Sequence, residues 1–129
     1  MLDQFTNNAF FWQKVDTIFV SSNHIFTRQK GESHPNYPNL IYPTTYGYLE
    51  DTSISENEIC FFKGSIDTNS VDAIVVCMDI LKKDLECKLL VGCTNEEELQ
   101  ILHYLNQTDF QKSVILRRGS EIPSWAITE

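Results

Sequence analysis

The chain is poor in basic side chains. It carries 10 Lys and Arg against 18 Asp and Glu over 129 residues, which gives a formal net charge of −8. Apart from the pairs Lys82-Lys83 and Arg117-Arg118, the sequence has no cluster of cations. Nucleic acids and anionic membrane surfaces are bound mainly through such clusters. We therefore expect neither a nucleic acid nor a membrane as a partner.

Long apolar runs and closely spaced cysteines are also missing. No segment approaches the about 18 apolar residues of a membrane span, and the first residues do not resemble a secretory leader. None of the cysteines forms the Cys-x-x-Cys pair that is typical of zinc and redox sites. They lie mostly in apolar runs, so we expect reduced thiols in the core: Cys60, Cys77, Cys87 and Cys93. These absences indicate a cytoplasmic protein.

The length and the apolar spacing indicate one domain. A chain of 129 residues can bury about two thirds of its extended surface, which is enough for a core without disulfides. Helical periodicity is expected at 8–20 and 95–107, and short strands at 25–93. A short strand or docking segment is expected at Val114–Arg117, and a tail at 119–129. We assign all of 1–129 to a single domain.

Both expected helices have recognisable N-termini. Asn7 or Asn8 can cap the first helix, and Thr94 with Glu97 forms a capping box at the second. The first helix carries an apolar stripe at helical spacing: Phe11, Trp12, Val15, Ile18 and Phe19. Core packing is one interpretation of this stripe. The other is a homo-oligomer contact through the N-terminal helix.

The most informative stretch is rich in tyrosine. It reads Tyr42-Pro-Thr-Thr-Tyr-Gly-Tyr-Leu49, and its prolines disfavour a helix, so we expect a strand. With a period of two, Tyr42, Tyr46 and Tyr48 share one face, which places several hydroxyl groups together. Gly47 between two tyrosines indicates a close approach of another backbone. An aromatic edge strand of a small β core is the alternative.

A charged block further along the chain has the pattern of a hairpin. Residues 82–85 are short and polar enough for the turn, and 86–93 form the returning strand. On that strand Glu86 and Lys88 face the same way, with Asp84 at the turn. The block therefore brings two carboxylates and one ammonium to one place, unless it is an ordinary charged hairpin.

The tyrosine run, preceded by Arg28-Gln-Lys-Gly-Glu-Ser-His-Pro35, resembles the soluble (family I) inorganic pyrophosphatases, whose pattern is Tyr-Pro-x-x-Tyr-Gly-Tyr. It is most similar to a short, divergent bacterial branch of that family. The resemblance extends over residues 10–118 as a pattern. Together with the order of the expected elements, it implies an α+β fold. That fold is a small five-stranded OB-like β-barrel with an N-terminal helix and a C-terminal helix.

The resemblance also implies a site that hydrolyses pyrophosphate or a related phosphoanhydride. Its catalytic residues would be Tyr46 and Asp84. Its substrate-binding residues would be Arg28, Lys30, Tyr46 and Lys88. Its metal ligands would be Glu56, Glu58, Asp84 and Glu86. In such a site a metal ion activates the attacking water, so Mg²⁺ is the expected cofactor, Mn²⁺ is the alternative, and a small phosphate-containing molecule is the expected ligand.

Three positions depart from the family pattern. Thr27, Ser55 and Cys60 stand where the family has acidic residues, and none of the three offers an anionic oxygen to Mg²⁺. We therefore expect weakened hydrolysis. The alternative is a catalytically inactive pseudoenzyme that binds a phosphate ligand or a protein. A third possibility is a binder of oligosaccharides or nucleotides, because small barrels host such ligands.

Overall fold

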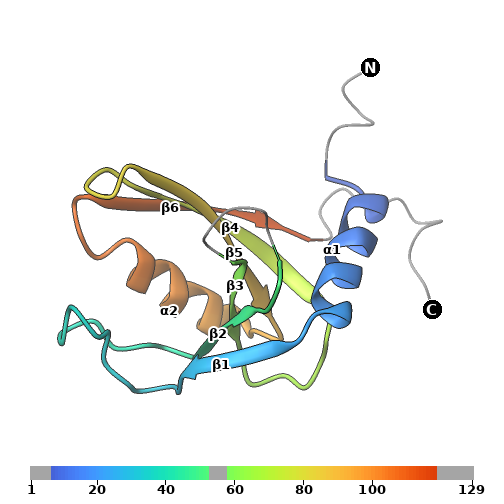
Figure 1. The fold of residues 1–129 in the computed structure, drawn as a ribbon, viewed down its shortest axis with the longest axis horizontal. Helices are drawn as coiled ribbons and strands as arrows, with labels where there is room; N and C mark the ends of the chain where they lie inside the picture. The colour runs from blue at the N-terminus through green and yellow to red at the C-terminus, as the bar shows by residue number, and fades with distance from the viewer. Residues whose placement is uncertain (1–6, 53–57, 119–129) are drawn as a thin grey trace.

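The computed structural model describes residues 7–52 and 58–118. Within these ranges the chain is α+β, with one helix before the strands and one after most of them (Figure 1). No helix in these ranges is long and apolar enough to cross a membrane. The tail expected at 119–129 lies outside the described residues. The elements are α1 (Ala9–Ser21), β1 (His24–Arg28), β2 (Thr45–Leu49), β3 (Cys60–Lys63), β4 (Val71–Asp79), β5 (Asp84–Val91), α2 (Asn95–Leu105) and β6 (Gln111–Arg117).

The strands form one open sheet in the order β1-β2-β3-β5-β4-β6. Only β3 and β5 run parallel. The expected closed five-stranded barrel is therefore not what the structure has. Strand β6 adds to the sheet beside β4, from Ala73↔Arg117 to Asp79↔Gln111, and the two edge strands β1 and β6 do not pair with each other. The predicted strand near 114–117 is confirmed, but it is longer than expected and forms an edge of the sheet.

Helix α1 covers one face of the sheet. Asn8 caps it, since its side chain accepts a hydrogen bond from the Phe11 amide at 3.1 Å. One side of the helix is buried against the sheet together with residues of β2 to β5. The members of this cluster are Trp12, Val15, Phe19, Leu49, Phe61, Val71, Ile74, Leu89 and Val91. Phe11 and Ile18 belong to the same sequence stripe but are exposed, so the core takes up only part of it.

A second connection holds α1 to the sheet. Asp16 accepts a hydrogen bond from the Val71 amide at 2.9 Å and forms an ion pair with Arg118 at 2.7 Å. The Arg118 guanidinium also lies over the Trp12 ring, 5.6 Å from its centroid. These contacts join the start of β4 and the end of β6 to the helix, so α1 is an integral part of the domain.

Helix α2 covers the opposite face of the sheet. Adjacent residues of a strand point to opposite faces, so Phe61 packs in the cluster with α1 and Phe62 packs in the cluster with α2. The capping box is confirmed: the Glu97 amide donates to Thr94 Oγ1 at 3.1 Å, and the Thr94 amide donates to Glu97 Oε1 at 2.9 Å. The apolar cluster on this face contains Tyr42, Phe62, Ala73, Val75, Leu90, Cys93, Ile101, Tyr104 and Leu105. This cluster forms the base of the pocket described below.

The close backbone approach predicted at Gly47 is confirmed. A β-carbon at this position would lie 2.3 Å from the carbonyl oxygen of Ile25 on β1. Non-bonded atoms cannot approach this closely, so only glycine lets β1 lie against β2 here. The glycine thereby fixes the position of the tyrosines on either side of it.

Candidate functional site

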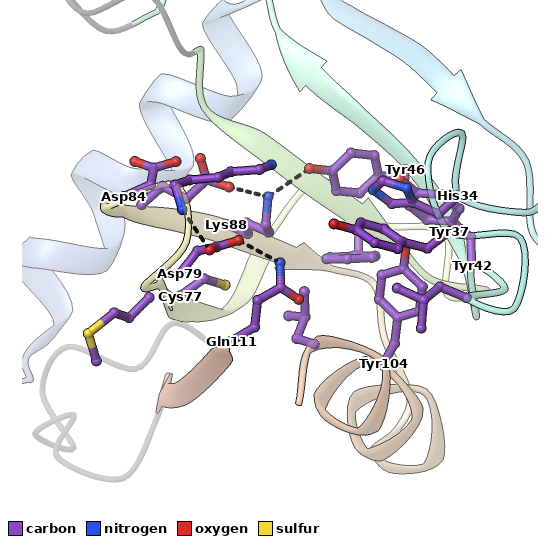
Figure 2. A pocket seen from close by; sticks show the side chains of 16 residues that line it. His34, Tyr37, Tyr42, Tyr46, Cys77, Asp79, Asp84, Lys88, Tyr104 and Gln111 are labelled. Atoms are coloured by element: carbon purple, nitrogen blue, oxygen red, sulfur yellow. Dashed lines mark hydrogen bonds and ion pairs between the residues drawn. The ribbon is translucent and has the colours of Figure 1, made fainter. Parts of the chain in front are cut away.

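A pocket opens between the tyrosine segment, the β4–β5 hairpin and the C-terminal end of α2 (Figure 2). Its volume is about 210 Å³. Pockets for drug-sized ligands are usually about 300–1,000 Å³, so this one suits a smaller molecule. The lining residues are His34, Tyr37, Leu40, Tyr42, Tyr46, Phe62, Cys77, Met78, Asp79, Lys82, Asp84, Glu86, Lys88, Tyr104, Leu105 and Gln111.

Lys88 lies at the centre of the pocket's polar groups. Lys88 is 9% exposed, and its ammonium nitrogen lies 2.8 Å from the Tyr46 hydroxyl and 2.6 Å from a Glu86 carboxylate oxygen. Burial alone would lower the pKa of Lys88, but its contacts with the Tyr46 hydroxyl and the Glu86 carboxylate outweigh burial and raise that pKa above its usual range. Burial raises the pKa of Tyr46. At neutral pH the pocket therefore presents a charged ammonium beside a neutral phenol.

One hydrogen-bond donor of Lys88 remains for a ligand at this point. An ammonium has three N–H donors, and among the described residues Tyr46 and Glu86 accept two of them. The Tyr46 hydroxyl accepts from Lys88 and is also hydrogen-bonded with the Cys60 side chain. Lys88 and Tyr46 lie together in the pocket (Figure 2). The remaining N–H donor of the ammonium is suited to an oxygen of an anionic ligand.

The Asp79 carboxylate, by contrast, stabilises the structure around the pocket through its hydrogen bonds. One of its oxygens accepts from the amides of Leu81 and Lys82 at 2.9 and 3.0 Å, and the other accepts from the Gln111 side chain at 3.1 Å. The hydrogen bond from the Lys82 amide is the main cause that lowers the pKa of Asp79. Asp79 thereby holds the β4–β5 turn against the start of β6. Asp84 and Lys82 extend the charged part of the lining.

Aromatic rings form the other part of the pocket. The centroid of the Tyr42 ring lies 5.0 Å from that of Tyr104 and 5.2 Å from that of Tyr46. His34 stacks nearly parallel to Tyr42, at an interplanar angle of 5°. Burial is the main cause that lowers the pKa of His34, and the charges of Lys82, Arg28 and Lys88 add to the effect. His34 is therefore a neutral side chain at neutral pH, in a region of positive potential.

The structure brings some of the expected site residues together and leaves others apart. Four of them line this pocket: Tyr46, Asp84, Glu86 and Lys88. Arg28 and Lys30, expected to bind substrate, are not among the lining residues. Lys30 is exposed in the turn after β1, which the Glu32 carboxylate closes by accepting from the Gln29 amide at 2.5 Å. The Arg28 guanidinium donates to the Thr27 carbonyl at 2.8 Å.

Of the expected metal ligands, Asp84 and Glu86 line the pocket and Glu58 does not. The Glu86 carboxylate is paired with Lys88, and Glu58 accepts from the Asp51 amide at 2.5 Å outside the pocket lining. Glu56 lies outside the described residues. Over 7–52 and 58–118 no group of three or more His, Cys, Asp or Glu side chains could hold a metal ion. Because Mg²⁺ requires near-octahedral oxygen ligands, the described residues do not fit a resident Mg²⁺ or Mn²⁺.

Several lining residues had no part in the site expected from the sequence, notably His34, Tyr104 and Gln111. His34 lies in the Ser-His-Pro part of the motif quoted above, which was a usable signal. Tyr104 follows Ile101 by three positions, so helical spacing places it on the buried side of α2. Gln111 reaches the pocket only because β6 pairs with β4, and no local pattern indicates this.

The expected pyrophosphatase site and the observed pocket thus share four residues, two of which, Asp84 and Glu86, were expected as metal ligands. No protein-family model, curated protein or solved structure shows significant similarity to this chain. Its function is therefore argued from the pocket itself.

Proposed function

We propose that this domain binds a small phosphate-containing anion in the pocket and hydrolyses phosphoanhydrides slowly or not at all. The observation that carries the proposal is the Lys88 ammonium, nearly buried and 2.8 Å from the Tyr46 hydroxyl. A buried charge is costly unless it is paired, and Glu86 supplies the pair. The ammonium then offers its third N–H donor to a phosphate oxygen. Hydrogen bonds from a cation to an anionic oxygen are the strong kind.

Lys82 supports an anion in the same place. It lines the pocket on the β4–β5 turn, and its charge lowers the pKa of the pocket residue His34. Asp79, three residues before Lys82, accepts hydrogen bonds from the Leu81 amide, the Lys82 amide and the Gln111 side chain. The lining thus has two lysines and three carboxylates, of which Asp79 holds the turn and Glu86 is paired with Lys88.

Weak hydrolysis is expected because the described residues bring together too few metal ligands. Attack on pyrophosphate near neutral pH needs a water made nucleophilic, which metal ions usually do by lowering its pKa. The described residues do not form such a metal site. Slow hydrolysis is nevertheless the second candidate function, because Asp84 lines the same pocket as Lys88 and Tyr46. A carboxylate in that position is suited to accept a proton from water.

The test is calorimetric titration of pyrophosphate into the protein in metal-free buffer, with two matched variants. Lys82→Gln and Lys83→Gln remove the same charge from adjacent, exposed residues, but only Lys82 lines the pocket. Lys82→Gln should weaken binding by about fivefold, or about 1 kcal/mol, and Lys83→Gln should leave it nearly unchanged.

Absence of binding to the unmodified protein, or an equal effect of the two variants, would overturn the proposal. A parallel assay of phosphate release with Mg²⁺ separates the two candidates. Turnover of about 10 per second or more would establish the hydrolase.

A further inference from the structure

The pocket has a charged end around Lys88 and an aromatic end around Tyr42, and the aromatic end carries the imidazole of His34 (Figure 2). The His34 ring stacks on Tyr42 at an interplanar angle of 5°, and its centroid lies 5.2 Å from that of the Tyr37 ring. The His34 amide donates to the Leu40 carbonyl at 2.8 Å, and the Tyr37 amide donates to the His34 carbonyl at 3.3 Å. The imidazole therefore has a defined place in the pocket wall, although it lies on the connection between β1 and β2.

A hydrogen bond also determines which nitrogen of this ring carries the proton. Nδ1 of His34 accepts from the Asn36 amide at 3.0 Å, so Nδ1 is unprotonated. Because the lowered pKa keeps His34 neutral at neutral pH, its single N–H proton is on Nε2. Among the described residues nothing accepts a hydrogen bond from Nε2. His34 is half-buried, and Nε2 is not one of the enclosed polar atoms without a partner, so a ligand can reach it.

Three cations act on this donor. After burial, the charges of Lys82, Arg28 and Lys88 are the causes that lower the pKa of His34. They come from three parts of the chain, namely the end of β1, the β4–β5 turn and β5. Their positive potential stabilises an anion beside the imidazole and opposes protonation of the ring. The Nε2–H group is therefore a neutral donor in a place that favours an anionic acceptor.

A row of side chains joins this donor to Lys88. His34 stacks on Tyr42, and the centroids of the Tyr42 and Tyr46 rings lie 5.2 Å apart. The Tyr46 hydroxyl in turn lies 2.8 Å from the Lys88 nitrogen. The third N–H of Lys88 and the Nε2–H of His34 are thus at opposite ends of the row, in one pocket of about 210 Å³. A ligand with two phosphoryl groups can use both donors, whereas a single phosphate held by Lys88 uses one.

We propose that His34 is the second ligand-binding donor of the pocket and that it makes the pocket select pyrophosphate over inorganic phosphate. One phosphoryl group accepts the third N–H of Lys88, and an oxygen of the other accepts from Nε2 of His34. This inference rests on the phosphate-binding function proposed above and assigns the specificity of that site to one residue.

The test is calorimetric titration of pyrophosphate and of inorganic phosphate in metal-free buffer at neutral pH. His34→Asn keeps an oxygen for the Asn36 amide but is too short to place a donor where Nε2 lies. It should weaken pyrophosphate binding about tenfold and inorganic phosphate binding less than about twofold. His34→Gln loses the bond to the Asn36 amide but can place an amide N–H at the position of Nε2, so it should recover most of the affinity. His103→Asn, at an exposed histidine of α2 outside the lining, should change neither affinity.

A second measurement leaves the site unaltered. In protein labelled with nitrogen-15 histidine, nuclear magnetic resonance should show His34 protonated on Nε2 and unprotonated on Nδ1. His34→Gln identifies these signals by removing them. Pyrophosphate should shift the Nε2 signal saturably, and inorganic phosphate should shift it much less.

The outcomes separate the two proposals. If pyrophosphate binds but His34→Asn binds it as tightly as His34→Gln, or weakens both ligands equally, the role of His34 is overturned and the phosphate site at Lys88 stands. The same holds if the His34 proton is on Nδ1, or if saturating pyrophosphate leaves the Nε2 signal in place. If pyrophosphate does not bind the unmodified protein, both proposals are overturned.

Discussion

The side-chain nitrogen of Lys88 lies 2.8 Å from the hydroxyl oxygen of Tyr46, 42 positions away in the chain. The two residues lie on β5 and β2, which are not neighbours, because β3 runs between them. In the register of the sheet Lys88 is opposite Cys60 and Tyr46 is opposite Phe62, so the two side chains meet across the intervening strand. The parallel pairing of β3 with β5 therefore creates the polar centre of the pocket.

Replacing Gly47 should separate β1 from β2. In Gly47→Ala the new β-carbon would collide with the Ile25 carbonyl oxygen, so one strand must shift. We expect a loss of about 1–3 kcal/mol in the free energy of unfolding, measured by urea denaturation. Thr45→Ala on the same strand, which adds no atom, is the control. A Gly47→Ala variant no less stable than Thr45→Ala would contradict this account of the strand pairing.

The stabilising effect of Glu97 should depend on pH. Burial alone would raise the pKa of this carboxyl, but hydrogen bonds from Thr94 and Ser65 outweigh burial and lower it below its usual 4.5. A lowered pKa means that the stabilisation is complete above the unfolded value and is lost as pH falls through the folded one. Glu97→Gln should therefore cost about 1 kcal/mol at pH 7 and progressively less below pH about 4.5.

The measurement is the free energy of unfolding of the unmodified protein and Glu97→Gln between pH 3 and 7. Glu96→Gln, an exposed neighbour in the first turn of α2, controls for the loss of one negative charge. A stability difference for Glu97→Gln that does not change with pH would show that the carboxylate charge is not what holds this turn.

Introducing acidic residues at Cys60 and Ser55 should raise hydrolysis with Mg²⁺. Cys60 is opposite Lys88 on the neighbouring strand, and its thiol contributes to the raised pKa of Tyr46, so it lies beside the polar centre. Cys60→Asp would add a carboxylate to Asp84 and Glu86 there. Combined with Ser55→Asp, which lies outside the described residues, it should raise phosphate release from pyrophosphate about tenfold or more. Cys87→Asp, at an exposed cysteine, is the control. No gain over that control in a folded protein would argue against a latent metal site.

Helix α1 remains the predicted surface for self-association. Phe11 and Ile18, seven positions apart and so on one side of this helix, are 42% and 43% exposed. Apolar side chains gathered on a surface favour an interface. Ile18→Asp should shift a homo-oligomer towards the monomer in light scattering after gel filtration, and Thr17→Asp, an exposed polar neighbour, should not. An unmodified protein that is monomeric at about 1 mM would contradict the prediction.

Local sequence patterns correctly predicted the features that depend on residues close together in the chain. The two helix caps follow from side chains that bond amides three residues away, and the pairing of Glu86 with Lys88 follows from the period of a strand. Gly47 gave a correct long-range prediction, because glycine inside a strand weakens it and is typical of places where another backbone comes close.

The open sheet and half of the pocket could not be predicted in this way. Whether a strand near the C-terminus closes a barrel or adds an edge depends on pairing such as Ala73↔Arg117, which the local sequence does not specify. The aromatic end forms because Tyr104 of α2 packs against Tyr42, more than 60 positions earlier in the chain. Lys30 was expected to share the site with Lys88, but the turn after β1 keeps it outside.

The most direct test of the phosphate-binding account is the nuclear magnetic resonance signal of the Lys88 ammonium in protein labelled with nitrogen-15 lysine. The hydrogen bonds to Tyr46 and Glu86 and the low exposure of Lys88 should slow proton exchange and make its signal visible, and Lys88→Arg identifies it by removing it. We predict that pyrophosphate in metal-free buffer shifts the Lys88 signal saturably and that the same ionic strength of chloride does not. A Lys88 signal that stays in place while pyrophosphate saturates the protein, or that moves equally with chloride, would contradict the account.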